Sequence, residues 1–196
     1  MTTSRLEAFS DGVIAILITI MVLELEAPHG SGLMALRPLL GVLASYALSF
    51  IFLGIYWSNH HHMLHAAERI DGKVLWANLH QLFWLSLTPF TTAWMGKTGA
   101  APLPVAAYGV VLVLSALAYT VLQATLIAVP GQHSRLEKAV GGDAKGKLSM
   151  VAYVVAIPLA FFQPWISIVV YAAVALTWLV PDRRIESRVV PNDGEK

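Results

Sequence analysis

Six long apolar runs, separated by short breaks, limit this sequence of 196 residues to one class of fold. A helix that crosses a bilayer needs about 20 mostly apolar residues. The runs that we expect to span the membrane cover residues 9–25, 39–57, 74–94, 105–129, 148–162 and 165–180. Apolar residues are continuous in each run, whereas the strands of a membrane β-barrel alternate with a period of two. We therefore predict an all-α membrane protein with six transmembrane helices per chain.

The composition excludes a water-soluble globular protein of this length. Hydrophobic residues make up 57% of the chain and charged residues only 13%, whereas soluble proteins carry about 25% charged residues. There is no cysteine, so disulfides and thiolate metal sites are excluded. The net charge is +1 and no block of like charge occurs, so nucleic acid is not an expected partner.

The breaks between the runs contain proline and glycine, which stop helices. They lie at Pro28 and Gly30, at Asp71 and Gly72, at 96–104, at Pro130 and Gly131, at Gln163 and Pro164, and at Pro181 and Asp182. The longest connection, at about 130–147, is a polar loop too short for a soluble domain. The first run is longer than a signal-peptide core and lacks a small-residue cleavage site, so we expect it to be retained. Residues 1–196 are thus expected to form a single transmembrane domain that ends in a short tail at 181–196.

Lysine and arginine are distributed unequally between the two sides of the predicted bundle. One side receives Arg5, Arg69, Lys73, Arg135, Lys138, Lys145, Lys147, Arg183, Arg184, Arg188 and Lys196. The other side receives Arg37 and Lys97. Cytoplasmic loops carry the excess of these residues, so we expect both termini in the cytoplasm.

One face of the first run carries a stripe with helical spacing. We call it the amino-terminal stripe, and it consists of Arg5, Phe9, Gly12, Ile16, Thr19, Leu23 and Glu26. Spacings of three and four residues place these side chains on one side of a helix and are typical of a helix that meets copies of itself around an axis. Asp11 points about 100° away from the stripe, and Ser10 lies nearly opposite it.

Two interpretations of the stripe are open from the residues alone. In the first, it is an ordinary packing seam, and the Thr19 hydroxyl bonds to the carbonyl four residues earlier. In the second, it is the wall of a pore, in which Ile16 and Leu23 form hydrophobic constrictions and Thr19 supplies a ring of hydroxyls. Glu26 and Glu24 would then raise the concentration of cations at the outer mouth.

Polar residues of the first three runs are expected at one depth near the cytoplasmic leaflet. They are Arg5, Ser10, Asp11, Trp57, Asn59, His60, His61, His62, His65, Asn78 and His80. An unpaired carboxylate at membrane depth is costly, so Asp11 needs partners. We expect Arg5 or a histidine, together with the Trp57 indole N–H, to partner it. Asp11 would then connect helices and would not line the pore.

The histidines also suggest other functions. His61 and His65 are four residues apart and could share a metal, but there is no HExxH motif and no cysteine. We therefore expect structural histidines, with no metal site, no catalytic residue and no cofactor. A transporter coupled to protons or metal through Asp11 and the histidines remains an alternative, with Pro89 and Pro158 as its only hints of interrupted helices. A membrane enzyme lacks a plausible acid, nucleophile and ligand set, and a scaffold explains the stripe poorly.

The segment RLEAFSDGVIAILITIMVLELE, residues 5–26, resembles the bacterial branch of the transmembrane protein 175 family, the endolysosomal-type potassium channels. That family is marked by an arginine, three spacers and Phe-Ser-Asp, which are Arg5, Phe9, Ser10 and Asp11 here. GIYWSNHHHML and NLHQLFWLSLTPFTT also resemble its second and third helices. The likeness covers residues 5–95 and is only topological beyond them.

This resemblance implies a potassium-selective leak-type channel of the bacterial inner membrane, without a TVGYG filter. It implies a homotetramer in the lipid bilayer, with the first helix lining a central pore for potassium and, as an open point, other monovalent cations or protons. The family's constriction positions correspond to Ile16 and Leu23, with Ile20 at the edge of that face, and its selectivity hydroxyl to Thr19. Its polar network corresponds to Arg5, Ser10 and Asp11, with Trp57, His61, Asn78 and His80 as the expected partners.

Overall fold

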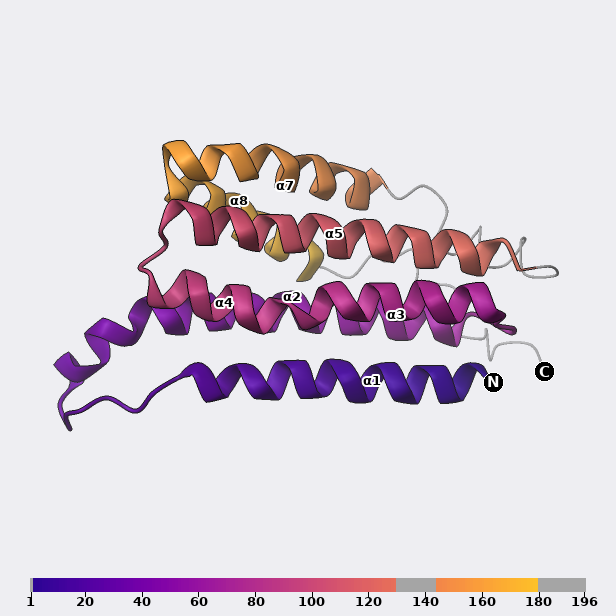
Figure 1. Cartoon of the computed structure of the whole chain (residues 1–196), viewed down its shortest axis with the longest axis horizontal. Coiled ribbons are helices and arrows are strands. Elements are labelled where there is room, and N and C mark those ends of the chain that lie inside the picture. The colour runs from indigo at the N-terminus through magenta and orange to yellow at the C-terminus, as the bar shows by residue number, and fades with distance from the viewer. Residues whose placement is uncertain (1, 130–143, 180–196) are drawn as a thin grey trace, which may run out of the picture.

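The computed structural model describes residues 2–129 and 144–179, and these form a bundle of helices with no β-strand (Figure 1). The α-helices are α1 (Thr3–Ile20), α2 (Leu40–His65), α3 (Gly72–Ser86), α4 (Thr88–Lys97), α5 (Pro102–Ile127), α7 (Ala144–Phe162) and α8 (Pro164–Leu179). Two 3₁₀ helices, η1 (Met21–Glu24) and η2 (Leu33–Leu39), continue α1 and precede α2. The predicted tail at 181–196 and most of the predicted loop at 130–147 lie outside the described residues.

Several of these helices are long and apolar enough to cross a membrane. They are Thr3–Glu24, Leu33–His65, Pro102–Ile127 and Lys145–Phe162, and α8 is a shorter apolar helix. Each overlaps one of the predicted runs. The prediction of an all-helical membrane protein is therefore confirmed.

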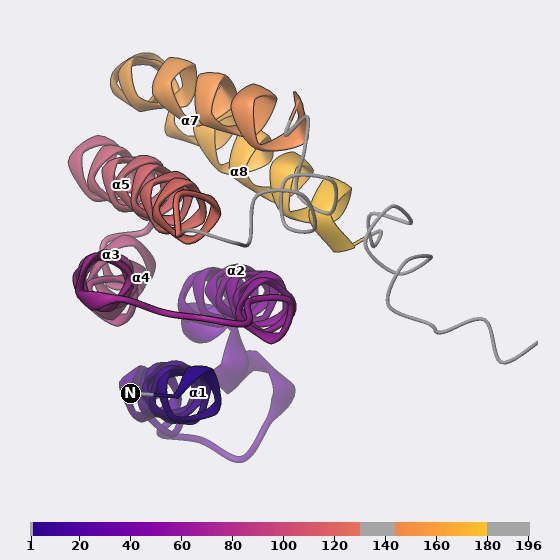
Figure 2. The same ribbon diagram turned by 90° about the vertical axis from the view of Figure 1, so that its right-hand side faces the viewer.

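The third predicted run, 74–94, is not one continuous helix. It is divided between α3 and α4 at Leu87, two residues before Pro89. Proline lacks an N–H, and its ring clashes with the carbonyl of the residue four positions earlier, so it kinks or interrupts an α-helix. The two helices nevertheless lie end to end along one line, as Figures 1 and 2 show from two directions.

The second predicted run, 39–57, stops before the end of the corresponding helix. The run was expected to stop at Trp57, but α2 continues through the polar segment to His65. The continuation buries His60, Met63 and Leu64 against neighbouring helices. Because this packing stabilises the helix where the sequence is polar, hydropathy alone placed its end too soon.

The helix α1 lies at one edge of the bundle (Figure 2). It packs against α2 and α3, and a further layer of α5, α7 and α8 covers the other side of those two helices. The apolar cluster beneath α1 contains Ile14, Leu17, Met21, Leu53, Leu82 and Leu85. One face of α1 is therefore fixed by its own chain, and the opposite face is left uncovered.

Gly96 marks the close crossing of α4 and α2. A Cβ atom on this residue would lie 2.9 Å from the Cα of Val42, which is backbone and cannot turn aside. We expect Gly96→Ala to lower the free energy of unfolding by about 1–3 kcal/mol, the usual cost of overpacking. Tryptophan fluorescence during thermal unfolding in detergent would measure it.

Gly54→Ala is the matched control for this prediction. Gly54 lies within α2, and a Cβ atom there meets nothing within 4 Å. Alanine should stabilise that helix by roughly 0.5–1 kcal/mol. Equal effects of the two substitutions would show that the approach of α4 to Val42 does not limit the side chain at position 96.

Candidate pore face and polar network of α1

The two faces of α1 differ sharply in burial. The buried residues of α1 are Leu6, Ser10, Ile14 and Leu17, which recur at spacings of three and four residues. This periodicity keeps them on one side of the helix, where they face α2 and α3. Ser10 is the one polar residue among them, and it is fully buried.

The amino-terminal stripe lies on the uncovered face. All its residues, from Arg5 to Glu26, are exposed in the single chain. Ile16 is 59% exposed and Leu23 is 78% exposed, and Ile20 is also exposed at the edge of the stripe. The described helices therefore do not use the stripe as a packing seam within the chain.

The hydroxyl of Thr19 has a partner within its own helix. Its Oγ1 donates a hydrogen bond to the carbonyl oxygen of Ile16 at 2.9 Å. The partner is three residues earlier, not four as expected. Because a hydroxyl has one proton and two lone pairs, the oxygen of Thr19 can still accept a hydrogen bond or a cation.

A buried polar network joins α1, α2 and α3. The Asn78 amide nitrogen donates to the Ser10 hydroxyl at 3.0 Å, and that hydroxyl can donate to the Leu6 carbonyl at 2.9 Å. His60 Nε2 lies 2.7 Å from the Asn78 carbonyl oxygen. That oxygen can only accept, so Nε2 of His60 carries the proton. All three side chains are fully buried, and the network ties the helices together by specific contacts.

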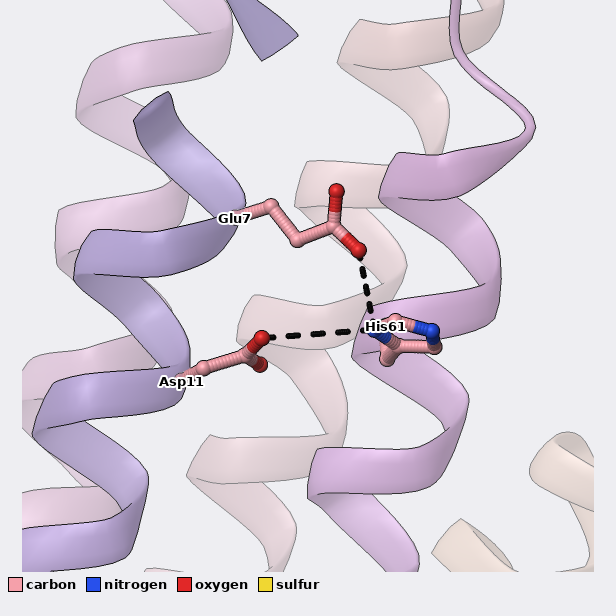
Figure 3. A group of neighbouring side chains, drawn as sticks. All are labelled: Glu7, Asp11 and His61. Carbon is pink, nitrogen blue, oxygen red and sulfur yellow. Dashed lines mark ion pairs between the residues drawn. The ribbon is translucent and has the colours of Figure 1, made fainter. Parts of the chain in front are cut away.

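Asp11 lies beside this network and faces α2. Its Oδ2 atom is 4.0 Å from Nδ1 of His61, and Oε1 of Glu7, one turn earlier on α1, is 2.8 Å from the same nitrogen (Figure 3). The three side chains are partly buried. The structure thus brings an α2 histidine to Asp11, and it adds an acid that the sequence analysis did not select.

Three other predicted partners lie elsewhere. Arg5 is exposed, and neither it nor the Trp57 indole forms a hydrogen bond to Asp11 among the described residues. Trp57 instead lies beside His61, with ring centroids 6.0 Å apart. His80 is exposed and accepts a hydrogen bond from the Trp84 indole at 2.9 Å. Helical rotation turns His80 away from Asn78, so it does not join the network.

The acids at the other end of α1 differ from each other. Glu24 accepts a hydrogen bond from Lys97 at 2.7 Å, which connects η1 to the end of α4. This hydrogen bond and the charge of Glu24 raise the pKa of Lys97 above its ordinary value. Glu26 is exposed. Lys97 therefore balances the negative charge of Glu24, whereas the negative charge of Glu26 is not balanced in this way.

Sequence reasoning gave too little weight to two residues of this region. His60 was one of three adjacent histidines, and spacing alone could not tell which one faces Asn78. Glu7 could have been found, because it precedes Asp11 by four residues and so lies on the same side of the helix.

Comparison with known proteins agrees with this architecture. The family model of the endosomal/lysosomal potassium channel TMEM175 matches residues 5–89. A potassium channel of Chryseobacterium sp. strain P1-3 is 50% identical over 98% of this chain and 100% of its own length. A potassium channel of Streptomyces collinus is 35% identical over 61% of this chain and 62% of that protein.

A solved structure shows the same likeness in three dimensions. The crystal structure of a lysosomal potassium-selective channel TMEM175 homolog from Chamaesiphon minutus matches with a TM-score of 0.75 at 26% identity. It covers 93% of this chain and 97% of that chain. The likeness therefore includes the helices after residue 95. The chain belongs to the TMEM175 family of endosomal/lysosomal potassium channels.

Proposed function

We propose that this protein is a leak-type potassium channel, in which four copies place the amino-terminal stripe around a shared pore. The observation that carries the proposal is the uncovered stripe on an edge helix whose other face is packed. Membership in the TMEM175 family supports potassium as the permeant ion, since the named relatives are potassium channels. The transport is passive, with no cofactor and no catalytic residue.

The residues of the stripe suggest how such a pore would work. Rings of Ile16 and Leu23 narrow the path and exclude water when closely spaced, with Ile20 at their edge. Thr19 lies between them, and its proton is already donated to the helix backbone. The lone pairs of four Thr19 oxygens would therefore be free to replace water around a potassium ion.

Attraction of cations at the outer mouth of the pore is expected to depend on one acidic residue. Glu24 is paired with Lys97, so its charge attracts cations weakly. Glu26 is exposed at the same end of the stripe and would draw cations toward the pore. Glu26 therefore attracts cations at the outer mouth, and Glu24 has a structural role.

We assign residues 1–196 to a single six-span channel domain of the bacterial inner membrane. The excess of lysine and arginine on one side supports cytoplasmic termini and a cytoplasmic tail at 181–196. Asp11 then lies near the cytoplasmic leaflet, where it holds α1 to α2 through His61. Arg5 extends the stripe at the same end.

Flux through purified protein in liposomes tests the proposed function. We expect potassium to leave the liposomes down its gradient and to leave faster when a protonophore is added, because proton entry then relieves the membrane potential that potassium efflux builds up. An electroneutral potassium–proton exchanger carries its own counter-charge and would move potassium without the protonophore. Protein-free liposomes provide the background, and a rate equal to theirs would contradict the proposal.

Replacing Thr19 by valine is expected to weaken the preference for potassium over sodium. Valine has nearly the shape of threonine but has no oxygen with which to coordinate an ion. We expect the permeability ratio, measured from reversal potentials in bilayers, to fall several-fold, and about tenfold if the hydroxyl ring contributes ~1.4 kcal/mol.

Thr120→Val is the matched control for the selectivity prediction. Thr120 is exposed on α5, and its hydroxyl also donates to its own helix, at the Ala116 carbonyl. This substitution should leave the ratio unchanged. If the permeability ratio of Thr19→Val were also unchanged, the hydroxyl of Thr19 would not contribute to selectivity.

A further inference from the structure

Glu7, Asp11 and His61 form a cluster of metal-ligating side chains outside the proposed pore face. Glu7 and Asp11 come from successive turns of α1, and His61 comes from α2 (Figure 3). Their donor atoms, two carboxylate oxygens and one imidazole nitrogen, all lie within 4.8 Å of one another. The side chains converge on one point between the two helices.

Two atoms of this cluster have no hydrogen-bond partner. Oδ1 of Asp11 and Nδ1 of His61 are inaccessible to solvent, and neither forms a hydrogen bond with a described residue. Nδ1 lies 2.8 Å from Oε1 of Glu7 as an ion-pair contact, but it forms no hydrogen bond there. Buried polar atoms without partners are uncommon, and an ion is one of the groups that satisfies them.

The distances suit a small transition-metal ion. Donor atoms around a tetrahedral zinc ion, bonded at about 2.0–2.2 Å, are roughly 3.3–3.5 Å apart. The two distances from His61 Nδ1, 2.8 Å to Glu7 and 4.0 Å to Asp11, lie on either side of this value. Small rotations of the side chains would bring all three donors to one ion, and water would fill the fourth position.

We propose that Glu7, Asp11 and His61 bind a divalent transition-metal ion, for which Zn²⁺ is the representative. Imidazole nitrogen favours zinc and its neighbours over calcium and magnesium, which prefer an all-oxygen shell. Two carboxylates offset the charge of the ion. The side chains are 18–40% exposed, so the cluster lies near the surface, and the side-chain rotations that bring the donors together would also admit the ion.

Metal binding would connect α1 to α2 by bonds that span the helix interface. An ion that binds the folded protein and not the unfolded chain raises its apparent stability in proportion to the logarithm of ion concentration. The proposal goes beyond the channel function. Binding of the metal is measured without potassium flux, so the metal site and the channel function can each be refuted while the other stands.

Isothermal titration of ZnCl₂ into detergent-purified protein, freed of metal by chelation, tests the site. We expect one Zn²⁺ per chain and a higher thermal unfolding midpoint that EDTA reverses. His61→Gln and Glu7→Gln each remove one donor and should weaken binding at least tenfold. Glu7→Gln keeps the buried network of Ser10, Asn78 and His60 intact, so its loss of binding would not follow from misfolding.

His62→Gln is the control, because His62 is exposed next to His61 but is not one of the three converging donors. It should bind Zn²⁺ as the unmodified protein does. Absence of stoichiometric binding by the unmodified protein would overturn the proposal. If His61→Gln and Glu7→Gln bound Zn²⁺ as tightly as the unmodified protein does, the proposal would also be overturned, and the cluster would act only as an ion pair.

Discussion

Replacement of Asn78 by leucine will lower the free energy of unfolding by about 2–5 kcal/mol. Asn78 is fully buried and holds both Ser10 of α1 and His60 of α2. Leucine has a similar volume but leaves His60 Nε2 and the Ser10 hydroxyl without these partners. Each unsatisfied buried group costs about 1–3 kcal/mol. The loss is measured by thermal unfolding in detergent, followed by tryptophan fluorescence.

Gln81→Leu supplies the control for this prediction. Gln81 lies one turn further along α3 and is also fully buried, but neither atom of its amide group has a hydrogen-bond partner among the described residues. Its replacement removes no hydrogen bond and should leave stability unchanged or higher. If both variants lost the same stability, the cost would come from repacking α3 and not from the polar network.

Replacing Ile16 and Leu23 together by serine will raise potassium flux through reconstituted protein by at least tenfold. Both side chains are large, apolar and exposed on the amino-terminal stripe. Rings of such side chains block ions by excluding water, and serine is both smaller and polar. A tenfold change corresponds to lowering the barrier by only ~1.4 kcal/mol. Potassium efflux from liposomes under a fixed gradient measures the change.

The Leu148→Ser and Val155→Ser pair is the matched control for flux. Leu148 and Val155 are exposed on α7 with the same spacing of seven residues. Their replacement should leave the rate per protein unchanged. A rise of similar size in both double variants would indicate general membrane leak and would contradict a constriction at the stripe.

The sequence predicted the helices well where apolar residues alone decide them. It failed at the polar end of α2, because burial of His60, Met63 and Leu64 prolongs that helix. It also predicted 74–94 as one run, although Pro89 was a hint of an interrupted helix, since apolarity continues across the break between α3 and α4. Tertiary packing and the missing proline N–H are not visible in a hydropathy pattern.

For the site, helical periodicity put the residues of the amino-terminal stripe on one face of α1 but left open whether that face packs within the chain. The partners of the polar residues were harder to predict. Depth in the membrane follows from position along a helix, but the choice among three adjacent histidines depends on how α2 is rotated against α1. Only the structure shows that His60 faces Asn78 and that His61 faces Asp11.

Thiol modification of Leu23→Cys tests most directly whether the stripe lines an ion path. The chain has no cysteine of its own, so the introduced thiol is unique. A cationic methanethiosulfonate reagent should remove most of the potassium flux of this variant. The same reagent should leave flux through Trp165→Cys unchanged, because Trp165 is exposed on α8, away from the stripe. Complete labelling of Leu23→Cys, verified by mass spectrometry, with no loss of flux would contradict a pore lined by α1.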